Sequence, residues 1–368
     1  NTYSGNTKDY IEVQGDYIDG NGTYVWAKDN GPYVVVGDVY VQRDNNSSHI
    51  STLQIASGTT VKFNSDIGLY IGGSSTNYKG ALTATGVTFT SLDSTGWPGI
   101  DFRSHAYDAG CLLDSCVIEN AVDGINCASS YPTITNSTIR NNTDGIDADA
   151  SSQPTITGNT FTGNTRPVSV YANRIDSTIY SNTYSGNTKD YIEVQGDYIN
   201  LDRTIIWSLD NSPYVVAGDV YVQRGNSSNV STLQIASGTT VKFNSGIDLF
   251  IGGSSTNYKG ALTATGVTFT SLDSTGWNGI RFRDFADASC SLDSCTIENA
   301  VDGIYCASSN PTITNSTIRN NTDGIYADAS SQPTITGNTF TGNTRPVSIS
   351  AHRIRNNISG NSYTGNTK

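Results

Sequence analysis

The amino-acid sequence predicts an all-β solenoid, a parallel β-helix with three short strands in each turn. Three observations predict it: a long repeat of about 180 residues, a shorter repeat of 21 to 23 residues inside it, and apolar residues at alternate positions in short bursts. Helical spacing of apolar residues is absent, while abundant Thr, Ser and Asn and 37 Gly residues suit many strands joined by frequent turns.

The long repeat divides the chain into two copies. The stretch NTYSGNTKDYIEVQGDYI at residue 1 returns at residue 182, and SSQPTITGNTFTGNTRPVS at residue 151 returns at residue 330. The junction has no linker composition. We therefore expect residues 1–181 and 182–360 to form two β-helix units that are continuous with each other, with residues 361–368 starting a third repeat.

Inside each copy, three apolar anchors recur every 21 to 23 residues, which indicates three strands per turn. The anchors are Ile118, Ile139, Phe161 and Tyr184, then Ile125, Ile146 and Val168, then Leu113, Ile134, Ile156 and Ile179. Apolar residues at alternate positions give each strand one buried face. A single turn cannot bury that face alone, so stacked turns must share one core, and about seven turns per copy give about 14 in all.

Asparagines mark the corners between strands. Asn120, Asn141, Asn164 and Asn187 recur just after one anchor strand. Asn tolerates a left-handed backbone, and its amide can bond to the Asn one turn above or below. We therefore expect these four residues to form a ladder along the solenoid.

Charge and composition exclude several classes of protein. The net charge is -12 and only 21 Lys and Arg are present, scattered along the chain, which argues against a nucleic-acid partner. No apolar run is long enough for a membrane span, and no apolar signal region opens the chain, so any export signal has been removed or lies outside it. An acidic, weakly charged surface fits an extracellular protein or contact with neutral glycans.

The six cysteines fall three to a copy and lack paired C-x2-C arms, which argues against a zinc site. We expect buried thiols or one internal bridge, and an inter-chain bridge stays open. Asn46 and Asn226 are the best loop candidates for N-glycosylation if the chain is exported.

The stretches ALTATGVTFTS, GWPGIDF, LDSCVIENAVDGI and PTITNSTIRNNTDGI resemble the right-handed parallel β-helix repeats of the pectin-lyase-like superfamily. They also look like modules of methanogen surface-layer proteins and of disaggregatase, which attacks a cell-wall polysaccharide. The resemblance covers most of each copy and implies a right-handed β-helix at the cell surface. It says little about activity, because the matching residues are core and turn positions.

One motif resembles a catalytic one. NNTDGIDADA resembles the first of four motifs of the polygalacturonase family, which would make Asp144 a catalytic carboxylate and Asp323 its counterpart in the second copy. The other three motifs have no match, and the arginine arrangement of pectate lyases is missing. The sequence therefore assigns no catalytic residue. A hydrolase would use Asp144, Asp147 and Asp149, and the same three carboxylates are the candidates for a calcium ion, although no cofactor is expected.

One outward face of the solenoid is the best candidate for a site. Its residues on successive turns of the first copy are Asp101, Arg103, Asn126, Asp147, Asp149, Ser169 and Tyr171. Those of the second copy are Arg281, Arg283, Tyr305, Tyr326, Asp328, Ser348 and Ser350. Asp147 and Asp149 would lie about 7 Å apart, a spacing that inverting glycosidases use. The candidates for glycan binding are Asp101, Arg103, Asn126, Tyr171, Arg281, Arg283, Tyr305 and Tyr326.

The sequence favours an extracellular structural module, a rod in a surface layer or sheath that associates with itself end to end or side by side. Near-identical inward residues in both copies and missing catalytic sets favour this interpretation. Two alternatives stay open. One is a polysaccharide hydrolase or lyase, and the other is a glycan-binding module without catalysis.

Overall fold

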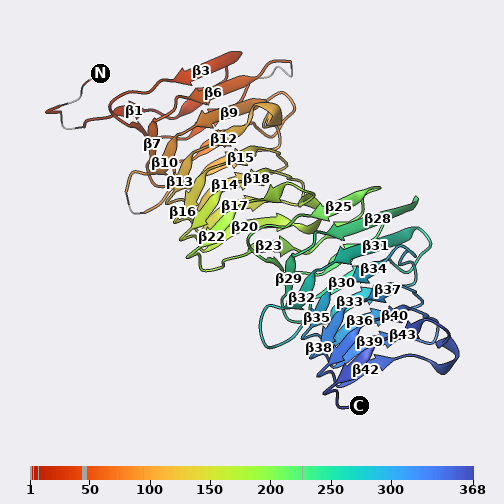
Figure 1. The fold of residues 1–368 in the computed structure, drawn as a ribbon. Coiled ribbons are helices and arrows are strands. Elements are labelled where there is room, and N and C mark those ends of the chain that lie inside the picture. The colour runs from red at the N-terminus through yellow and green to blue at the C-terminus, as the bar shows by residue number, and fades with distance from the viewer. Residues whose placement is uncertain (1, 3, 7, 44–47, 94, 226) are drawn as a thin grey trace. The chain divides into compact units, whose positions relative to one another are not determined.

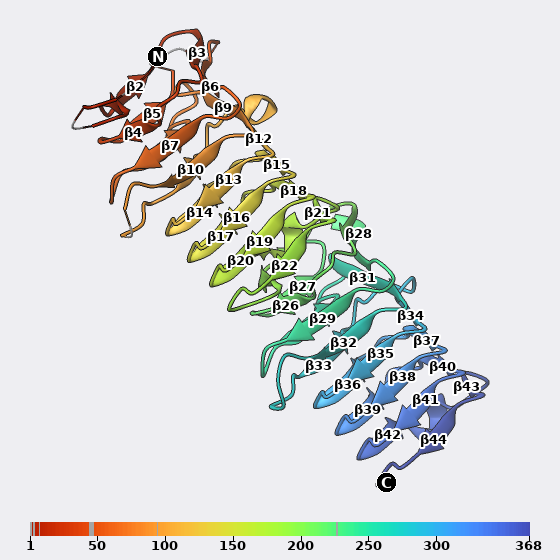
Figure 2. The same ribbon diagram turned by 60° about the vertical axis from the view of Figure 1, so that its left-hand side comes forward.

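A computed structural model describes all residues of the chain except 1, 3, 7, 44–47, 94 and 226. Two compact units make up the chain. Asn1–Val170 and Thr178–Ile192 form the first, and Tyr171–Ser177 and Glu193–Lys368 form the second. In each unit short parallel strands stack turn upon turn (Figures 1 and 2). Asn46, one of the two expected glycosylation sites, and Asn226, the other, lie outside the described residues.

The first unit has three parallel ladders, here called sheets 1, 2 and 3, and each turn contributes one strand to each. Sheet 1 contains β1 (Ile11–Val13), β4 (Tyr33–Val35), β7 (Thr60–Phe63), β10 (Thr88–Ser91), β13 (Val117–Glu119), β16 (Thr138–Arg140), β19 (Thr160–Thr162) and β22 (Thr183–Ser185). Sheet 2 contains β2 (Asp16–Ile18), β5 (Val39–Val41), β8 (Leu69–Ile71), β11 (Ile100–Phe102), β14 (Asp123–Cys127), β17 (Asp144–Ala148) and β20 (Arg166–Tyr171). Sheet 3 contains β3 (Gly22–Trp26), β6 (Ser51–Ile55), β9 (Gly80–Thr85), β12 (Leu112–Asp114), β15 (Thr133–Thr135), β18 (Thr155–Thr157) and β21 (Ile179–Tyr180).

The second unit repeats this arrangement. Its sheet 1 contains β23 (Ile192–Gln195), β26 (Tyr214–Val216), β29 (Thr240–Phe243), β32 (Thr268–Ser271), β35 (Thr296–Glu298), β38 (Thr317–Arg319), β41 (Thr339–Thr341) and β44 (Ser362–Thr364). Its sheet 2 contains β24 (Tyr198–Ile199), β27 (Val220–Val222), β30 (Asp248–Ile251), β33 (Gly279–Phe282), β36 (Asp302–Cys306), β39 (Asp323–Ala327) and β42 (Arg345–Ser348). Its sheet 3 contains β25 (Thr204–Trp207), β28 (Ser227–Ile235), β31 (Tyr258–Thr265), β34 (Ser291–Asp293), β37 (Thr312–Thr314), β40 (Thr334–Thr336) and β43 (Ile358–Ser359).

The predicted anchors align as expected, so the three-strand turn is confirmed. Ile118 pairs with Ile139 and Ile139 with Phe161 in sheet 1, and all three side chains are fully buried. The same holds for the anchors of sheets 2 and 3, which pair in register from turn to turn. Like residues stacked over one another therefore fill the core of each unit, as the repeat requires.

The predicted asparagine ladder is right at Asn164 and Asn187 and wrong at Asn120 and Asn141. Asn120 and Asn141 have the expected left-handed backbone, with φ of 60° and 56°. The buried ladder instead runs through Asn142, Asn164 and Asn187, where each side-chain oxygen accepts the backbone N–H of the turn before. The left-handed residue turns the chain at the corner, so it is the next side chain that points inward. Asn141 is therefore a turn residue and Asn142 the ladder residue.

Cysteine and tryptophan side chains belong to the core. All six cysteines are free thiols and buried, which confirms the expectation of buried thiols. Trp97 stacks on Phe63 with ring centroids 4.1 Å apart, and Trp277 stacks on Phe243 at 4.0 Å. In the described part of the chain, helical structure is confined to three 3₁₀ turns, and none is long and apolar enough to cross a membrane.

Candidate functional site

The outward face of sheet 2 in the first unit carries an unbroken row of polar and aromatic side chains. Val39 and Val41, or Leu69 and Ile71, point inward, so the residue between them points out. Strand pairing sets the outward residues in register, one per turn. The row is Tyr17, Tyr40, Tyr70, Asp101, Asn126 and Asp147.

Three tyrosines form the first part of this row. The rings of Tyr17 and Tyr40 stack with centroids 4.9 Å apart, and those of Tyr40 and Tyr70 do the same at 4.9 Å. Tyr17 is 54% exposed, while Tyr40 and Tyr70 are half-buried. Burial raises the pKa of both inner hydroxyls. The three rings therefore form one aromatic ladder on the outward face.

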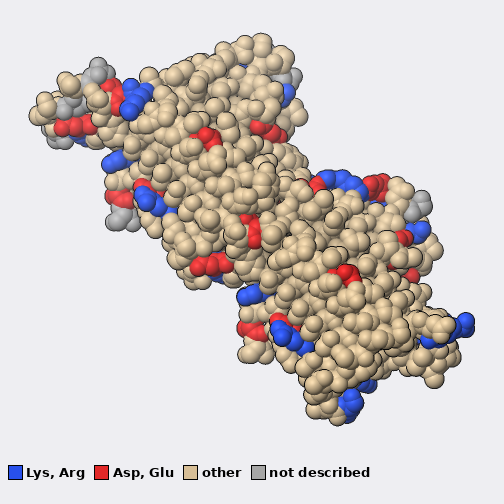
Figure 3. Space-filling model, viewed as in Figure 1, with Lys and Arg blue, Asp and Glu red and all other residues tan. Residues whose placement is uncertain are grey.

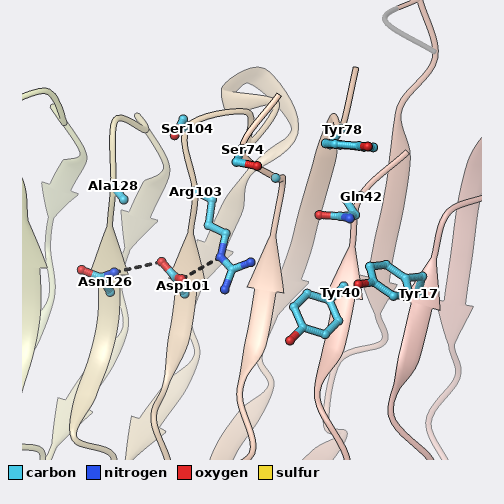
Figure 4. Close-up of a pocket in the computed structure, with 11 residues that line it drawn as sticks. Tyr17, Tyr40, Gln42, Ser74, Tyr78, Asp101, Arg103, Ser104, Asn126 and Ala128 are labelled. Atoms are coloured by element: carbon cyan, nitrogen blue, oxygen red, sulfur yellow. Dashed lines mark hydrogen bonds and ion pairs between the residues drawn. The ribbon is translucent and has the colours of Figure 1, made fainter. Parts of the chain in front are cut away.

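Polar side chains adjoin the end of the tyrosine ladder. The Arg103 guanidinium lies over the Tyr70 ring, with Cζ 4.1 Å from its centroid, and Arg103 Nε donates to Asp101 Oδ2 at 2.9 Å. Asn126 Nδ2 donates to the other oxygen of Asp101, also at 2.9 Å. Figure 4 shows this chain of contacts beside Tyr40 and Tyr17. The structure thus brings together three predicted residues, Asp101, Arg103 and Asn126, and Asp101 neutralises Arg103.

The first unit has a groove of about 400 Å³ here, lined by Tyr17, Tyr40, Asp101, Arg103 and Asn126. Its other walls include Gln42, Ser74 and Tyr78, which come from the segments that follow β5 and β8 (Figure 4). We call the groove together with Tyr17, Tyr40 and Tyr70 the tyrosine face. An aromatic ladder flanked by amide and guanidinium groups suits a ligand with apolar faces and many hydroxyl groups, which is the chemistry of a sugar.

The sequence predicts Asp101, Arg103 and Asn126 as candidates for glycan binding, but it does not predict the tyrosine ladder. A signal was present, because each tyrosine stands alone between two apolar residues or beside one, in DYI, VYV and LYI. Tyr171, the remaining candidate from the first copy, is the last residue of β20 and belongs to the second compact unit.

The candidate catalytic carboxylates are already engaged. Asp144 accepts two hydrogen bonds from Arg166, from Nε at 2.8 Å and from Nη2 at 2.7 Å. Asp147 lies 3.4 Å from the same Nη2. Asp149 stabilises the corner after the strand, where its carboxylate accepts hydrogen bonds from the backbone N–H groups of Ser129 and Ser151. Nothing in these contacts sets up one carboxylate as an acid and another as a base.

Asp123, a carboxyl group that the sequence analysis does not single out, has a raised pKa. Asp123 pairs in register with Asp144 at the start of β14 and β17. Burial, followed by the charges of Asp144 and Asp147, raises the pKa of Asp123 to about 6, and the Arg166 guanidinium acts in the opposite direction. The periodicity of the sequence gives no indication of this pKa shift, because the shift depends on which charges lie beside the carboxyl group.

The second unit carries its own version of this face. Tyr198, Tyr221 and Phe250 stack with centroids 4.7 and 4.8 Å apart. Two predicted tyrosines, Tyr305 and Tyr326, form a separate pair at 5.3 Å. The two predicted arginines separate the aromatic groups, and Arg281 lies over Tyr305 while Arg283 lies over Phe250.

The described residues offer no preformed metal site. Within the described ranges, no group of three or more His, Cys, Asp or Glu side chains is placed to hold an ion. A calcium ion at Asp144, Asp147 or Asp149 would have to compete with the Arg166 and backbone contacts given above. On the face drawn in Figure 3, acidic and basic side chains lie scattered in small groups.

Stacked parallel turns with three strands each define a β-solenoid protein. A family model described as the right handed beta helix region matches residues 45–226 and 245–368. The chain therefore belongs to the right-handed β-helix family, as its resemblance to those repeats implied. Comparison with characterised proteins found no significant match.

Proposed function

We propose that this chain is a glycan-binding module without catalytic activity, with the tyrosine face of its first unit as the binding site. The stacked rings of Tyr17, Tyr40 and Tyr70 carry this proposal. The three phenol rings stack on one another, so their outward edges and hydroxyl groups form an aromatic track against which sugar rings can pack. Arg103, Asn126 and Gln42 stand at one end of the track, where they can bond to sugar hydroxyls.

The engaged carboxylates support binding over catalysis. A glycosidase needs one carboxyl group to donate a proton and another to act as nucleophile or base. Asp144 is held by Arg166, and Asp149 by backbone donors of the corner. Asp149, which the sequence pairs with Asp147 for an inverting mechanism, thus has a structural role in the turn, and this supports binding over catalysis.

A glycan array followed by titration calorimetry tests the proposal. The best neutral oligosaccharide from the array should bind the whole chain, and Tyr40→Ala should weaken that binding at least tenfold because it interrupts the ladder. Tyr131→Ala is the matched control, since Tyr131 is 44% exposed and lies outside the face. Equal losses in both variants, or no saturable binding to any neutral glycan, would overturn the proposal.

A hydrolase remains the second candidate because of Asp123 alone. A carboxyl group with a pKa of about 6 could deliver a proton near neutral pH. Incubation with neutral and acidic polysaccharides should release no reducing ends and no unsaturated products. Product formation that disappears in Asp123→Asn would favour the enzyme instead.

We also propose an extracellular or cell-surface location and a structural role in a surface layer or sheath. The acidic, weakly charged composition and the resemblance to methanogen surface modules support this. Self-association, end to end or side by side, is part of the same proposal. Light scattering behind a size-exclusion column should show species larger than one chain as concentration rises, and a monomer at every concentration would contradict it.

A further inference from the structure

The second unit keeps the frame of the tyrosine face but changes its charges. Tyr198, Tyr221 and Phe250 repeat the aromatic ladder, and Gln223, Ser254 and Tyr258 stand where Gln42, Ser74 and Tyr78 line the groove of the first unit. A glycan that fits one frame therefore finds a similar shape in the other, and the charges decide which glycan each unit prefers.

Two substitutions between the copies rearrange the ion pairs. Asp101 of the first unit is replaced by Arg281, and Gly68 by Asp248. Arg281 Nε pairs with Asp248 Oδ1, and Arg281 Nη1 lies 3.6 Å from Asp302 Oδ2. The new arginine thus takes the new carboxylate, and the position that held the partner of Arg103 no longer carries a negative charge.

Among the described residues, Arg283, the counterpart of Arg103, has no ionic partner. Its Cζ lies 3.8 Å from the ring centroid of Phe250 and 5.7 Å from that of Tyr221. In the part of the chain that the structure describes, its guanidinium makes no hydrogen bond and no ion pair. Two aromatic rings hold the charged group in place while its N–H donors stay open.

The nearby carboxylates do not satisfy Arg283. Asp219 Oδ1 accepts the backbone N–H of Asp248, and Asp219 Oδ2 accepts from the Tyr221 hydroxyl at 3.3 Å. Asp284, which replaces Ser104 at the edge of the groove, is exposed and forms no ion pair with its neighbour among the described residues. An anion is therefore the group that would best pair with the Arg283 guanidinium.

We infer that the face around Arg283 binds an anionic sugar, one that carries a carboxylate or a sulfate group, whereas the tyrosine face of the first unit binds a neutral sugar. The anion would accept hydrogen bonds from the Arg283 guanidinium, and the sugar ring would pack against the outward edges of Tyr221 and Tyr198. This inference rests on the proposed function only in taking the ligand to be a carbohydrate. It assigns the two units different ligand classes within one chain.

Affinity electrophoresis of the whole chain tests this with matched polymers. Alginate supplies carboxylates and its propylene glycol ester is the neutral control, while dextran sulfate and dextran form the second pair. Alginate or dextran sulfate should retard the chain, and the polymer that retards it more identifies the anion. Arg283→Gln should weaken that binding at least tenfold, because a charge-assisted hydrogen bond is lost. Arg103→Gln, the matched change in the first unit, should alter it less than twofold.

Additional variants separate the two proposals. Arg283→Lys should keep part of the affinity, and Asp284→Ser should raise it by removing a nearby negative charge. Equal retardation by the charged and neutral polymers, or an Arg283→Gln variant that binds as tightly as the wild type, would overturn the inference. The proposed function of the first unit fails by a different result. It is wrong if Tyr40→Ala leaves the binding of neutral glycans unchanged.

Discussion

The Arg103 guanidinium lies over the ring of Tyr70 while its Nε donates to the Asp101 carboxylate at 2.9 Å. The corresponding pair in the second unit, Arg283 over Phe250, has the ring contact and lacks the carboxylate. A single side chain in sheet 2 therefore decides whether a ring-stacked guanidinium is neutralised or open. Two copies with one frame can in this way present different charges to a ligand.

Asp101→Asn should open the first unit to anions. The variant keeps a side-chain oxygen for Asn126 but removes the charge that neutralises Arg103. In an Arg283→Gln background, where alginate retardation has been lost, Asp101→Asn should restore at least threefold of the binding. Asp101→Glu, which retains the charge, is the control and should restore none. The same electrophoresis measures all three, and no gain with Asp101→Asn would show that the ion pair does not govern the charge of this face.

Asn164→Ala should destabilise the first unit by about 3 kcal/mol. The Asn164 side chain accepts the backbone N–H of Asn142 and donates to the Ile139 carbonyl, both buried, so its removal leaves the Asn142 N–H without this partner and takes one hydrogen bond from the carbonyl. Urea denaturation followed by circular dichroism measures the loss.

Asn141→Gly is the control for the ladder. Asn141 has a φ of 56°, and Gly163 occupies the same corner one turn later with a φ of 67°. Glycine accepts this backbone without strain, so the stability should change by about 0.5 kcal/mol or less. A larger cost for Asn141→Gly than for Asn164→Ala would reverse the assignment of turn and ladder residues.

The periodicity of the sequence predicts the pairing of the strands but not the orientation of side chains at the corners. Ile134 and Ile156 can be paired from the sequence because the repeat varies only between 21 and 23 residues, which gives the register directly. The choice between Asn141 and Asn142 could not, since two adjacent polar residues share the same period and only the corner geometry decides which one points inward.

The site shows the same limit. Tyr17, Tyr40 and Tyr70 lie 23 and 30 residues apart, because the early turns carry longer excursions that obscure the repeat. Asp101, Arg103 and Asn126 were found because alternation places them outward. Their ion pair and ring contact depend on side-chain conformations that no spacing reveals, as does the contact of Arg166 with Asp144.

Asp123→Asn should stabilise the first unit near neutral pH. The folded pKa of about 6 lies above the unfolded value of about 3.9, so ionised Asp123 opposes folding at pH 7.5. As the pH falls through 6 the folded protein takes up the proton, and this penalty is lost. The unfolding free energy of Asp123→Asn should exceed that of the wild type by about 1 kcal/mol at pH 7.5, after allowance for solvent screening, and should match it at pH 4.

Asp302→Asn in the second unit provides the comparison for that pH profile. Burial also raises the pKa of Asp302, but Arg281 lies 3.6 Å away and opposes the shift. Its stabilising effect at pH 7.5 should therefore be the smaller of the two. Urea titrations at several pH values measure both variants, and a gain for Asp123→Asn that does not vary with pH would show that the carboxyl group is not the cause.

The six thiols should be inert in the folded protein and fully reactive once it unfolds. Burial raises the pKa of Cys111 and Cys290 to about 12 and that of Cys116 and Cys295 to about 11, and it raises the pKa of Cys127 and Cys306 as well. A thiol must be ionised and accessible to react with an alkylating agent. Iodoacetamide at pH 8 should therefore add no label to the native chain and six labels in denaturant without reductant, as mass spectrometry would show. Fewer than six labels after unfolding would reveal a disulfide, and labelling of the native chain would place a thiol at the surface.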